Sequence, residues 1–188
     1  MLRVLTGAIE ARDPYTRGHS ARVTALAEAV ARQLGWSDER LASLRVGGPL
    51  HDIGKLAVSD EVLRKEGCLD DGELAQIREH PKIGARMLLR MAALREAIPY
   101  VLYHHERWDG HGYPSGKAGE EIPIEARVLA VADAFDAMTS DRPYRRALSR
   151  ADALAEVERC AGTQFDPEIA RVFLGLFAES ELPAAAAS

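Results

Sequence analysis

The 188-residue chain has only two cysteines, Cys68 and Cys160. Two cysteines cannot build the disulfide framework of a small secreted domain, so the sequence predicts a protein of the reducing cytoplasm. Long hydrophobic runs are also missing, because charged residues interrupt every stretch before the roughly 20 apolar residues that a bilayer requires. No basic segment leads into an apolar one near Met1, so we expect neither a signal peptide nor a membrane span in this chain.

A surplus of positive charge is missing as well. The chain holds 24 basic and 29 acidic residues, which gives a net charge of -5. Proteins that bind nucleic acid polymers usually carry a basic excess, so we expect no such polymer as a partner. The apolar fraction of 47% excludes disorder throughout the chain. The length suits a single domain, at about 100–200 residues per domain.

Alternating, strand-like segments are missing, and a helical period runs through most of the chain. Apolar residues recur every three or four positions from His19 to Gly35, which is typical of an amphipathic helix. The same pattern predicts an all-α domain of seven or eight helices over residues 1–178, followed by a disordered tail at residues 179–188. We expect Gly47-Gly48-Pro49 to bend or restart its helix just before His51.

One segment, Asp109 to Pro123, interrupts the helical pattern. It holds Gly110, Gly112, Pro114, Gly116 and Gly119, a density of helix breakers that predicts a loop. A loop of this length in a compact domain is usually either functional or disordered. The segment is therefore a candidate for function.

Histidines and acidic residues supply the candidate chemistry. They are His19, His51, Asp52, His80, His104, His105, His111 and, further on, Asp133. Imidazole with carboxylate suits iron, manganese, nickel, cobalt or zinc better than calcium or magnesium. Paired cysteines are missing, which argues against a structural zinc site. Taken singly, a histidine such as His19 on an apolar helix face is equally explained as a core residue with a hydrogen-bond partner.

The combination of these residues favours two neighbouring metal ions. The ligands are too many for one tetrahedral ion, and the two carboxylate oxygens of Asp52 could bridge a pair. Two divalent ions outweigh the charge of Asp52, Asp133 and a bridging hydroxide, so the site would keep a positive charge that attracts a phosphodiester. Lys55 would add a further positive group at its mouth.

Two motifs resemble those of a known family. His51 to Lys55 reads HDIGK, and His104 to Pro114 reads HHERWDGHGYP. Together they resemble the HD-GYP subfamily of the HD superfamily of metal-dependent phosphohydrolases. The stretches at residues 12–20, 133–140 and 141–145 are similar to that family too, so the resemblance covers nearly the whole chain.

The resemblance implies a single HD-type helical domain with a GYP loop. It implies hydrolysis of cyclic di-GMP to linear pGpG, and in some members onward to GMP, by a metal-bridging hydroxide that attacks the phosphodiester. It also implies two divalent ions, iron before manganese. Their ligands would be His19, His51 and Asp133 on one ion and His80, His104 and His105 on the other, with Asp52 bridging. A third ion is not expected, because Tyr15 stands where some members have a glutamate.

Other roles follow from the same resemblance. Lys55 would contact the scissile phosphate and act with Asp52 in catalysis. Arg142, Arg145 and Tyr113 would bind the substrate. Residues 109–114, the GYP loop, would dock diguanylate cyclase domains.

Three further residues are expected outside the ligand set. We expect Glu106 and Asp109 to serve the loop or to orient a ligand imidazole by accepting its free N–H. We expect His111 to be an exposed loop residue.

Two alternatives stay open. The chain could be an HD-type hydrolase of another cyclic dinucleotide, or a non-catalytic module that binds diguanylate cyclases through the GYP loop. An intact ligand set argues against the module. The oligomeric state is left open, with a dimer as one option.

Overall fold

The computed structural model describes residues 2–12, 18–65, 67–141 and 146–180. Three expectations fall outside these ranges: the substrate contacts of Arg142 and Arg145, the place of Tyr15, and the tail from residue 181. The last described helix, α10 (Pro167–Ser180), continues to Ser180. Within the described ranges, no helix is both long and apolar enough to cross a membrane.

The described residues form α-helices and short 3₁₀ helices, which confirms the all-α prediction. Besides α10, the α-helices are α1 (Leu2–Arg12), α2 (His19–Gln33), α3 (Asp38–Leu50), α4 (Asp60–Leu63), α5 (Asp71–Arg78), α6 (His80–Leu89), α7 (Ile98–Tyr103), α8 (Ile124–Thr139) and α9 (Arg150–Arg159). The 3₁₀ helices are η2 (Ile53–Ala57), η3 (Ala92–Ala97) and η4 (Gly119–Glu121). The predicted count of seven or eight is too low, because it did not include α1 and because α4, with 4 residues, is too short to show a period.

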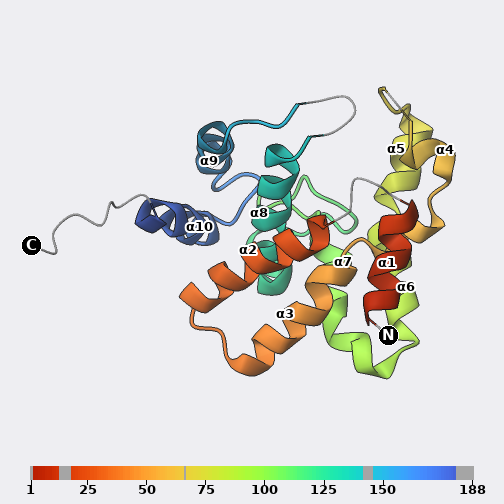
Figure 1. Cartoon of the computed structure of the whole chain (residues 1–188), viewed down its shortest axis with the longest axis horizontal. Helices are drawn as coiled ribbons and strands as arrows, with labels where there is room; N and C mark the ends of the chain where they lie inside the picture. Colours follow the sequence, from red (N-terminus) through yellow and green to blue (C-terminus); the bar gives the residue numbers. More distant parts are fainter. Residues whose placement is uncertain (1, 13–17, 66, 142–145, 181–188) are drawn as a thin grey trace, which may run out of the picture.

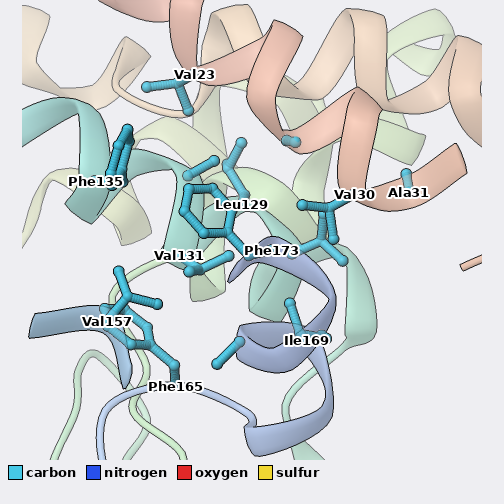
Figure 2. Close-up of a cluster of buried hydrophobic side chains, with 14 of the residues drawn as sticks. Val23, Val30, Ala31, Leu129, Val131, Phe135, Val157, Phe165, Ile169 and Phe173 are labelled. Atoms are coloured by element: carbon cyan, nitrogen blue, oxygen red, sulfur yellow. The ribbon is translucent and has the colours of Figure 1, made fainter. Parts of the chain in front are cut away.

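A large apolar core joins α2, α8, α9 and α10. Figure 2 shows Val23 and Val30 of α2 facing Leu129 of α8 and Phe173 of α10. The rings of Phe135 and Phe173 meet edge to face, with centroids 5.1 Å apart. This core fixes α8, and with it the predicted ligand Asp133, against the helix that carries His19.

A second apolar core is built from residues of α1, α3, η2, α6, η3 and α7. Figure 1 shows α1, α6 and α7 on the side of the molecule away from α9 and α10. Its buried members are Ile9, Leu50, Ile53, Leu88, Leu94, Ala97 and Val101. These residues come from the same elements that carry His51, His80 and His104. The packing therefore holds the ends of these elements at one place.

Glycines allow the helices of this half to approach closely. A Cβ at Gly47 would lie 2.2 Å from the ring of Tyr100, and one at Gly54 would lie 1.8 Å from the carbonyl oxygen of His80. The expected restart of the helix at Gly47-Gly48-Pro49 is wrong, because α3 runs through Pro49 without interruption and ends at Leu50, directly before His51. Pro49 lacks the backbone N–H that would bond to the carbonyl oxygen of Arg45, and the helix ends one residue later, with His51 as its C-cap residue.

Candidate metal centre

All seven predicted ligands come together between the two cores, most of them at helix ends. His19 begins α2, His51 ends α3, Asp52 precedes η2, His80 begins α6, His104 and His105 follow α7, and Asp133 lies within α8. Five ligands form two groups that share a sixth, Asp52: His80, His104 and His105 on one side, and His19 and His51 on the other. Asp133 joins the second group, with its Oδ1 at 3.2 Å from Nε2 of His19.

Backbone carbonyls orient three of the imidazoles. The Nδ1 atoms of His51, His80 and His104 lie 2.6 Å, 2.8 Å and 3.0 Å from carbonyl oxygens three residues earlier, at Gly48, Ile77 and Val101. Because a carbonyl only accepts, each Nδ1 must carry the proton and each Nε2 is left with a lone pair. The local helix geometry thus prepares three nitrogen ligands without help from distant residues.

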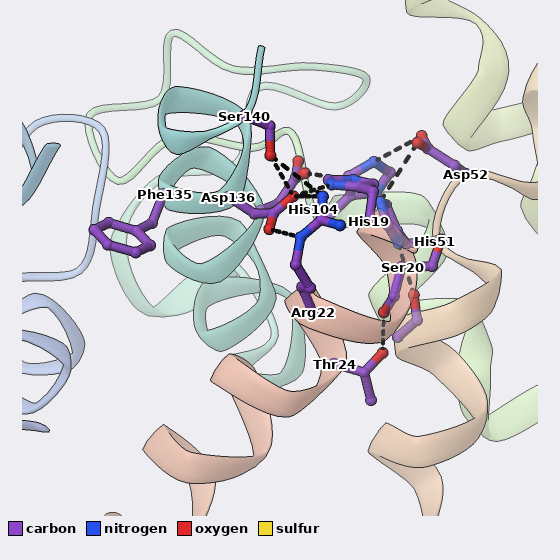
Figure 3. Close-up of polar contacts among 12 residues, drawn as sticks. His19, Ser20, Arg22, Thr24, His51, Asp52, His104, Phe135, Asp136 and Ser140 are labelled. Carbon is purple, nitrogen blue, oxygen red and sulfur yellow. Dashed lines mark hydrogen bonds and ion pairs between the residues drawn. The ribbon is translucent and has the colours of Figure 1, made fainter. Parts of the chain in front are cut away.

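His19 is oriented differently, by a buried carboxylate. Its Nδ1 lies 2.7 Å from Oδ2 of Asp136, a residue on α8 that is 4% exposed (Figure 3). Arg22 donates to both oxygens of Asp136, from Nε at 2.6 Å and from Nη2 at 3.0 Å. The chain Arg22–Asp136–His19 therefore ties α2 to α8 beside the cluster.

The Nε2 atoms at the centre of the cluster lack a hydrogen-bond donor among the described residues. Nε2 of His80 and Nε2 of His104 lie 3.3 Å apart, yet both are acceptors when each Nδ1 donates to its carbonyl. Nε2 of His51 is buried and has no hydrogen-bond partner among the described residues. Facing lone pairs are unfavourable unless a proton or a cation lies between them. This donor set of imidazole and carboxylate therefore fits divalent transition metals.

Asp52 sits between the two groups. Its Oδ1 is 3.3 Å from Nε2 of His80, whereas its Oδ2 is 3.5 Å from Nε2 of His51. Nζ of Lys55 donates to Oδ2 at 2.8 Å. The two carboxylate oxygens thus face different histidines, which is the arrangement that a bridging ligand needs.

The backbone of η2, which carries Lys55, is held from α1. The guanidinium of Arg12 donates to the carbonyl oxygens of Leu56 and Val58 and, at 2.7 Å, to Asp60. Lys55 remains partly accessible, with 22% of its side chain exposed. It can therefore reach a bound molecule while it keeps its contact with Asp52.

Burial and charge set the protonation of the cluster. Burial, together with the neighbouring histidines, holds the pKa of His104 well below its ordinary value and lowers the pKa of His105 to about 3. Burial opposes the charge of Asp52, but Lys55 and the histidines hold its pKa well below the usual range. Neutral imidazoles and ionised carboxylates are the forms that bind metals.

His19 departs from this pattern. Burial alone would lower its pKa, but the hydrogen bonds to Asp133 and Asp136 raise it to about 9. Nε2 of His19 and Oδ1 of Asp133 lie 3.2 Å apart, so a metal cation bound by both would compete with a proton for the same place.

The GYP loop packs on the cluster through Tyr113. Its ring stacks on His105 with centroids 4.8 Å apart, and its backbone N–H donates to the carbonyl oxygen of His105 at 3.1 Å. Buried Glu106 accepts backbone N–H groups from Ser115 at 2.7 Å and Lys117 at 3.2 Å. The loop is thus folded around its own carboxylate and against a predicted ligand.

The remaining loop expectations are met in part. Glu106 and Asp109 serve the loop as expected, since Asp109 pairs with Arg107 at 2.6 Å. Backbone carbonyls orient His51, His80 and His104, and Asp136 orients His19, so Glu106 and Asp109 orient none of these four imidazoles. The side chain of His111 is 84% exposed, as expected of a loop residue.

A cleft of about 230 Å³ opens beside the cluster. Its walls include His104, His105, Asp133, Tyr113, Arg107, Gln164 and Arg78.

Three residues in or near the cluster and the cleft were missed by the sequence analysis: Asp136, Arg22 and Arg78. The signal for Asp136 was a second charged residue, three positions after Asp133, in the largely apolar stretch from residue 128 to residue 139, whereas Arg22 and Arg78 gave none.

The chain belongs to the HD domain family, whose model matches residues 3–169. As the sequence predicts, its motifs place it with the HD-GYP members. It is 45% identical over 169 residues to the cyclic di-GMP phosphodiesterase PA4108 of Pseudomonas aeruginosa, covering 88% of this chain and 40% of the relative. It is 39% identical over 178 residues to a cyclic di-GMP phosphodiesterase of Thermotoga maritima, covering 94% and 48%.

A solved structure supports the fold independently. The cyclic GMP-AMP phosphodiesterase V-cGAP3 of Vibrio cholerae superposes with a TM-score of 0.73 at 20% identity, over 93% of this chain and 47% of that one. The chain therefore spans less than half the length of these proteins. The HD domain is what this chain shares with them.

Proposed function

We propose that this chain is a phosphodiesterase that binds two divalent metal ions and hydrolyses cyclic di-GMP. The observation that carries the proposal is the pair of buried ligand groups that share Asp52. The ligands would be His19, His51 and Asp133 for one ion and His80, His104 and His105 for the other, with Asp52 common to both. Iron is the first choice and manganese the second, because both suit imidazole with carboxylate.

When bound, the ions would activate a water molecule and polarise the phosphodiester. Lys55 would hold a non-bridging oxygen of the phosphate or deliver a proton to the leaving 3′ oxygen, since its Nζ lies beside Asp52 and is partly exposed. Asp52 would keep Lys55 in place while it holds the ions. Tyr113, stacked on His105, would form one wall of the substrate site, and Arg142 and Arg145 would contact the nucleotide.

Cyclic di-GMP is the proposed substrate because two relatives at 39–45% identity carry that name. The product would be linear pGpG, with GMP from a second round. The structural neighbour that acts on cyclic GMP-AMP makes another cyclic dinucleotide the second candidate. Docking of diguanylate cyclases on residues 109–114 and a cytoplasmic location, in keeping with the two free cysteines, complete the proposal.

Anaerobic reconstitution tests this function. The purified protein is loaded with Fe(II) or Mn(II), incubated with cyclic di-GMP, and its products are separated by chromatography. We expect pGpG or GMP from the wild type and neither from the double variant His51→Ala/Asp52→Ala.

Other outcomes separate the alternatives. No product from protein that holds about two ions per chain would redirect the search to other cyclic dinucleotides. No product and no bound metal would favour the non-catalytic module.

A further inference from the structure

The cleft beside the cluster has an uneven charge. Arg107 lines it but is neutralised by Asp109, which accepts from Nε at 3.0 Å and from Nη2 at 2.6 Å. Arg78 lines it too, at the last position of α5, and is exposed. No ion pair of Arg78 occurs within the part of the chain that the structure describes. Arg78 is therefore the cation of this cleft that an anionic ligand can use.

Contacts with the ring of Tyr113 place Arg78 close to the cluster. Cζ of Arg78 lies 5.6 Å from the ring centroid of Tyr113, and the same ring stacks on His105, at 4.8 Å between centroids. The guanidinium is thus one ring removed from a predicted metal ligand. An anion bound by Arg78 would lie beside, and not at, the place where the ions bind.

A cyclic dinucleotide presents two phosphodiester groups on one ring. The scissile group belongs at the ligand cluster, next to Asp52 and Lys55. The second group carries its own negative charge and must be held elsewhere on the protein. A guanidinium matches a phosphate better than other cations do, because it donates two parallel hydrogen bonds.

We propose that Arg78 is a substrate-binding residue that holds the second, non-scissile phosphodiester of the cyclic dinucleotide. This role rests on the proposed function. It makes the cleft selective for a substrate with two phosphates, since a single phosphodiester would be bound at the cluster alone. It also gives Tyr113 a second task, which is to support the guanidinium between its ring and solvent.

Two substrates test this role. Cyclic di-GMP has two phosphodiesters, whereas bis(p-nitrophenyl) phosphate has one and reports on the cluster alone. For Arg78→Ala, we expect KM for cyclic di-GMP to rise about tenfold, as for a lost hydrogen bond to a charged group, with kcat within about twofold of the wild type. Turnover of bis(p-nitrophenyl) phosphate and the metal content should stay unchanged, and Arg78→Lys should fall between.

Arg171→Ala is the matched control. Arg171 is an exposed arginine on α10, it does not line the cleft, and its loss changes the net charge equally. An unchanged KM for cyclic di-GMP in Arg78→Ala would overturn the role of Arg78. So would an equal loss on both substrates, because it would place Arg78 at the cluster. Failure of the wild type to hydrolyse cyclic di-GMP would instead overturn the proposed function, and this role with it.

Discussion

Nδ1 of His19 lies 2.7 Å from a carboxylate oxygen of Asp136, a residue 117 positions away in the sequence. The corresponding atoms of His51, His80 and His104 donate to carbonyl oxygens of their own chain segments. A carboxylate is the stronger acceptor and makes the opposite imidazole nitrogen a better donor to a metal. The half of the cluster that contains His19 is therefore electronically distinct from the other half.

Replacing Asp136 should weaken one half of the metal centre. Asp136→Asn keeps the shape of the side chain but removes the charge that faces His19 and Arg22. We expect metal affinity to fall by about 10–100-fold at one of two sites, as is usual when a partner of a ligating histidine is lost. Competition with a chromophoric chelator measures both affinities.

Asp71→Asn serves as the control, because Asp71 is exposed at the start of α5. Equal affinities in the Asp136 and Asp71 variants would show that the carboxylate does not support the metal.

Asp52 and Lys55 should separate metal binding from turnover. Asp52→Ala removes the residue common to both ligand groups, so we expect lost turnover together with reduced metal content. Lys55→Ala removes a donor to the substrate and the contact of Nζ with Asp52, but it leaves every predicted ligand in place, and the histidines still favour the ionised form of Asp52. We therefore expect turnover to fall by about 10²-fold while the metal stays bound. Metal analysis by mass spectrometry and a phosphodiesterase assay on the same samples decide the matter. Full activity in Asp52→Ala would exclude the dinuclear arrangement.

Sequence reasoning predicted which residues gather in the cluster, but not which groups orient them. His51 and His104 could be recognised because motif residues stand next to each other in the chain. The contact between His19 and Asp136 could not, because it depends on how α2 packs against α8. For the same reason, Arg78 gave no signal, since its place depends on where the GYP loop returns to α5.

The helix restart predicted at residues 47–49 illustrates a second limit. Glycine and proline lower helix propensity locally, but close packing overrides this where only glycine fits. The ring of Tyr100 occupies the space beside Gly47, so packing and not propensity decides that α3 continues. A single sequence shows the low helix propensity of glycine and proline, but it does not show that the ring of Tyr100 packs beside Gly47.

An ion pair between α2 and α3 should make the free energy of unfolding depend on pH in the acidic range. Arg45 and Arg32 donate to Glu28, at 2.6 Å each, and lower its pKa from 4.5 to about 2. A carboxylate with a lowered pKa stabilises the fold above its unfolded pKa of 4.5 and loses this contribution as the pH falls toward 2.

We therefore expect Glu28→Gln to cost less than about 1 kcal/mol at neutral pH, since the pair is largely solvated. The difference in the free energy of unfolding between this variant and the wild type should become smaller as the pH falls to about 3. Urea unfolding at both pH values measures it, with the exposed Glu39→Gln as control. A difference that does not change with pH would show that Glu28 acts through packing.

Among the glycines near the metal centre, Gly54 should be the one whose substitution most reduces stability and metal binding. It follows Asp52 by two residues, and a Cβ there would lie 1.8 Å from the carbonyl oxygen of His80 and 2.7 Å from the amide nitrogen of Gly84. Both atoms belong to the backbone of α6, so a side chain cannot simply rotate away. We expect Gly54→Ala to destabilise the fold by about 1–3 kcal/mol or more and to reduce metal binding, because His80 must move with its helix.

Gly175→Ala is the matched control for this prediction. Gly175 lies inside α10, and nothing surrounds its Cβ position within 4 Å. Alanine there should stabilise the helix by about 0.5–1 kcal/mol, because it restricts the unfolded chain without a clash. Urea unfolding and metal analysis of the two variants separate the effect of space from that of propensity. If Gly54→Ala were as stable and as metal-bound as Gly175→Ala, the contact between η2 and α6 would not be what positions His80 beside Asp52.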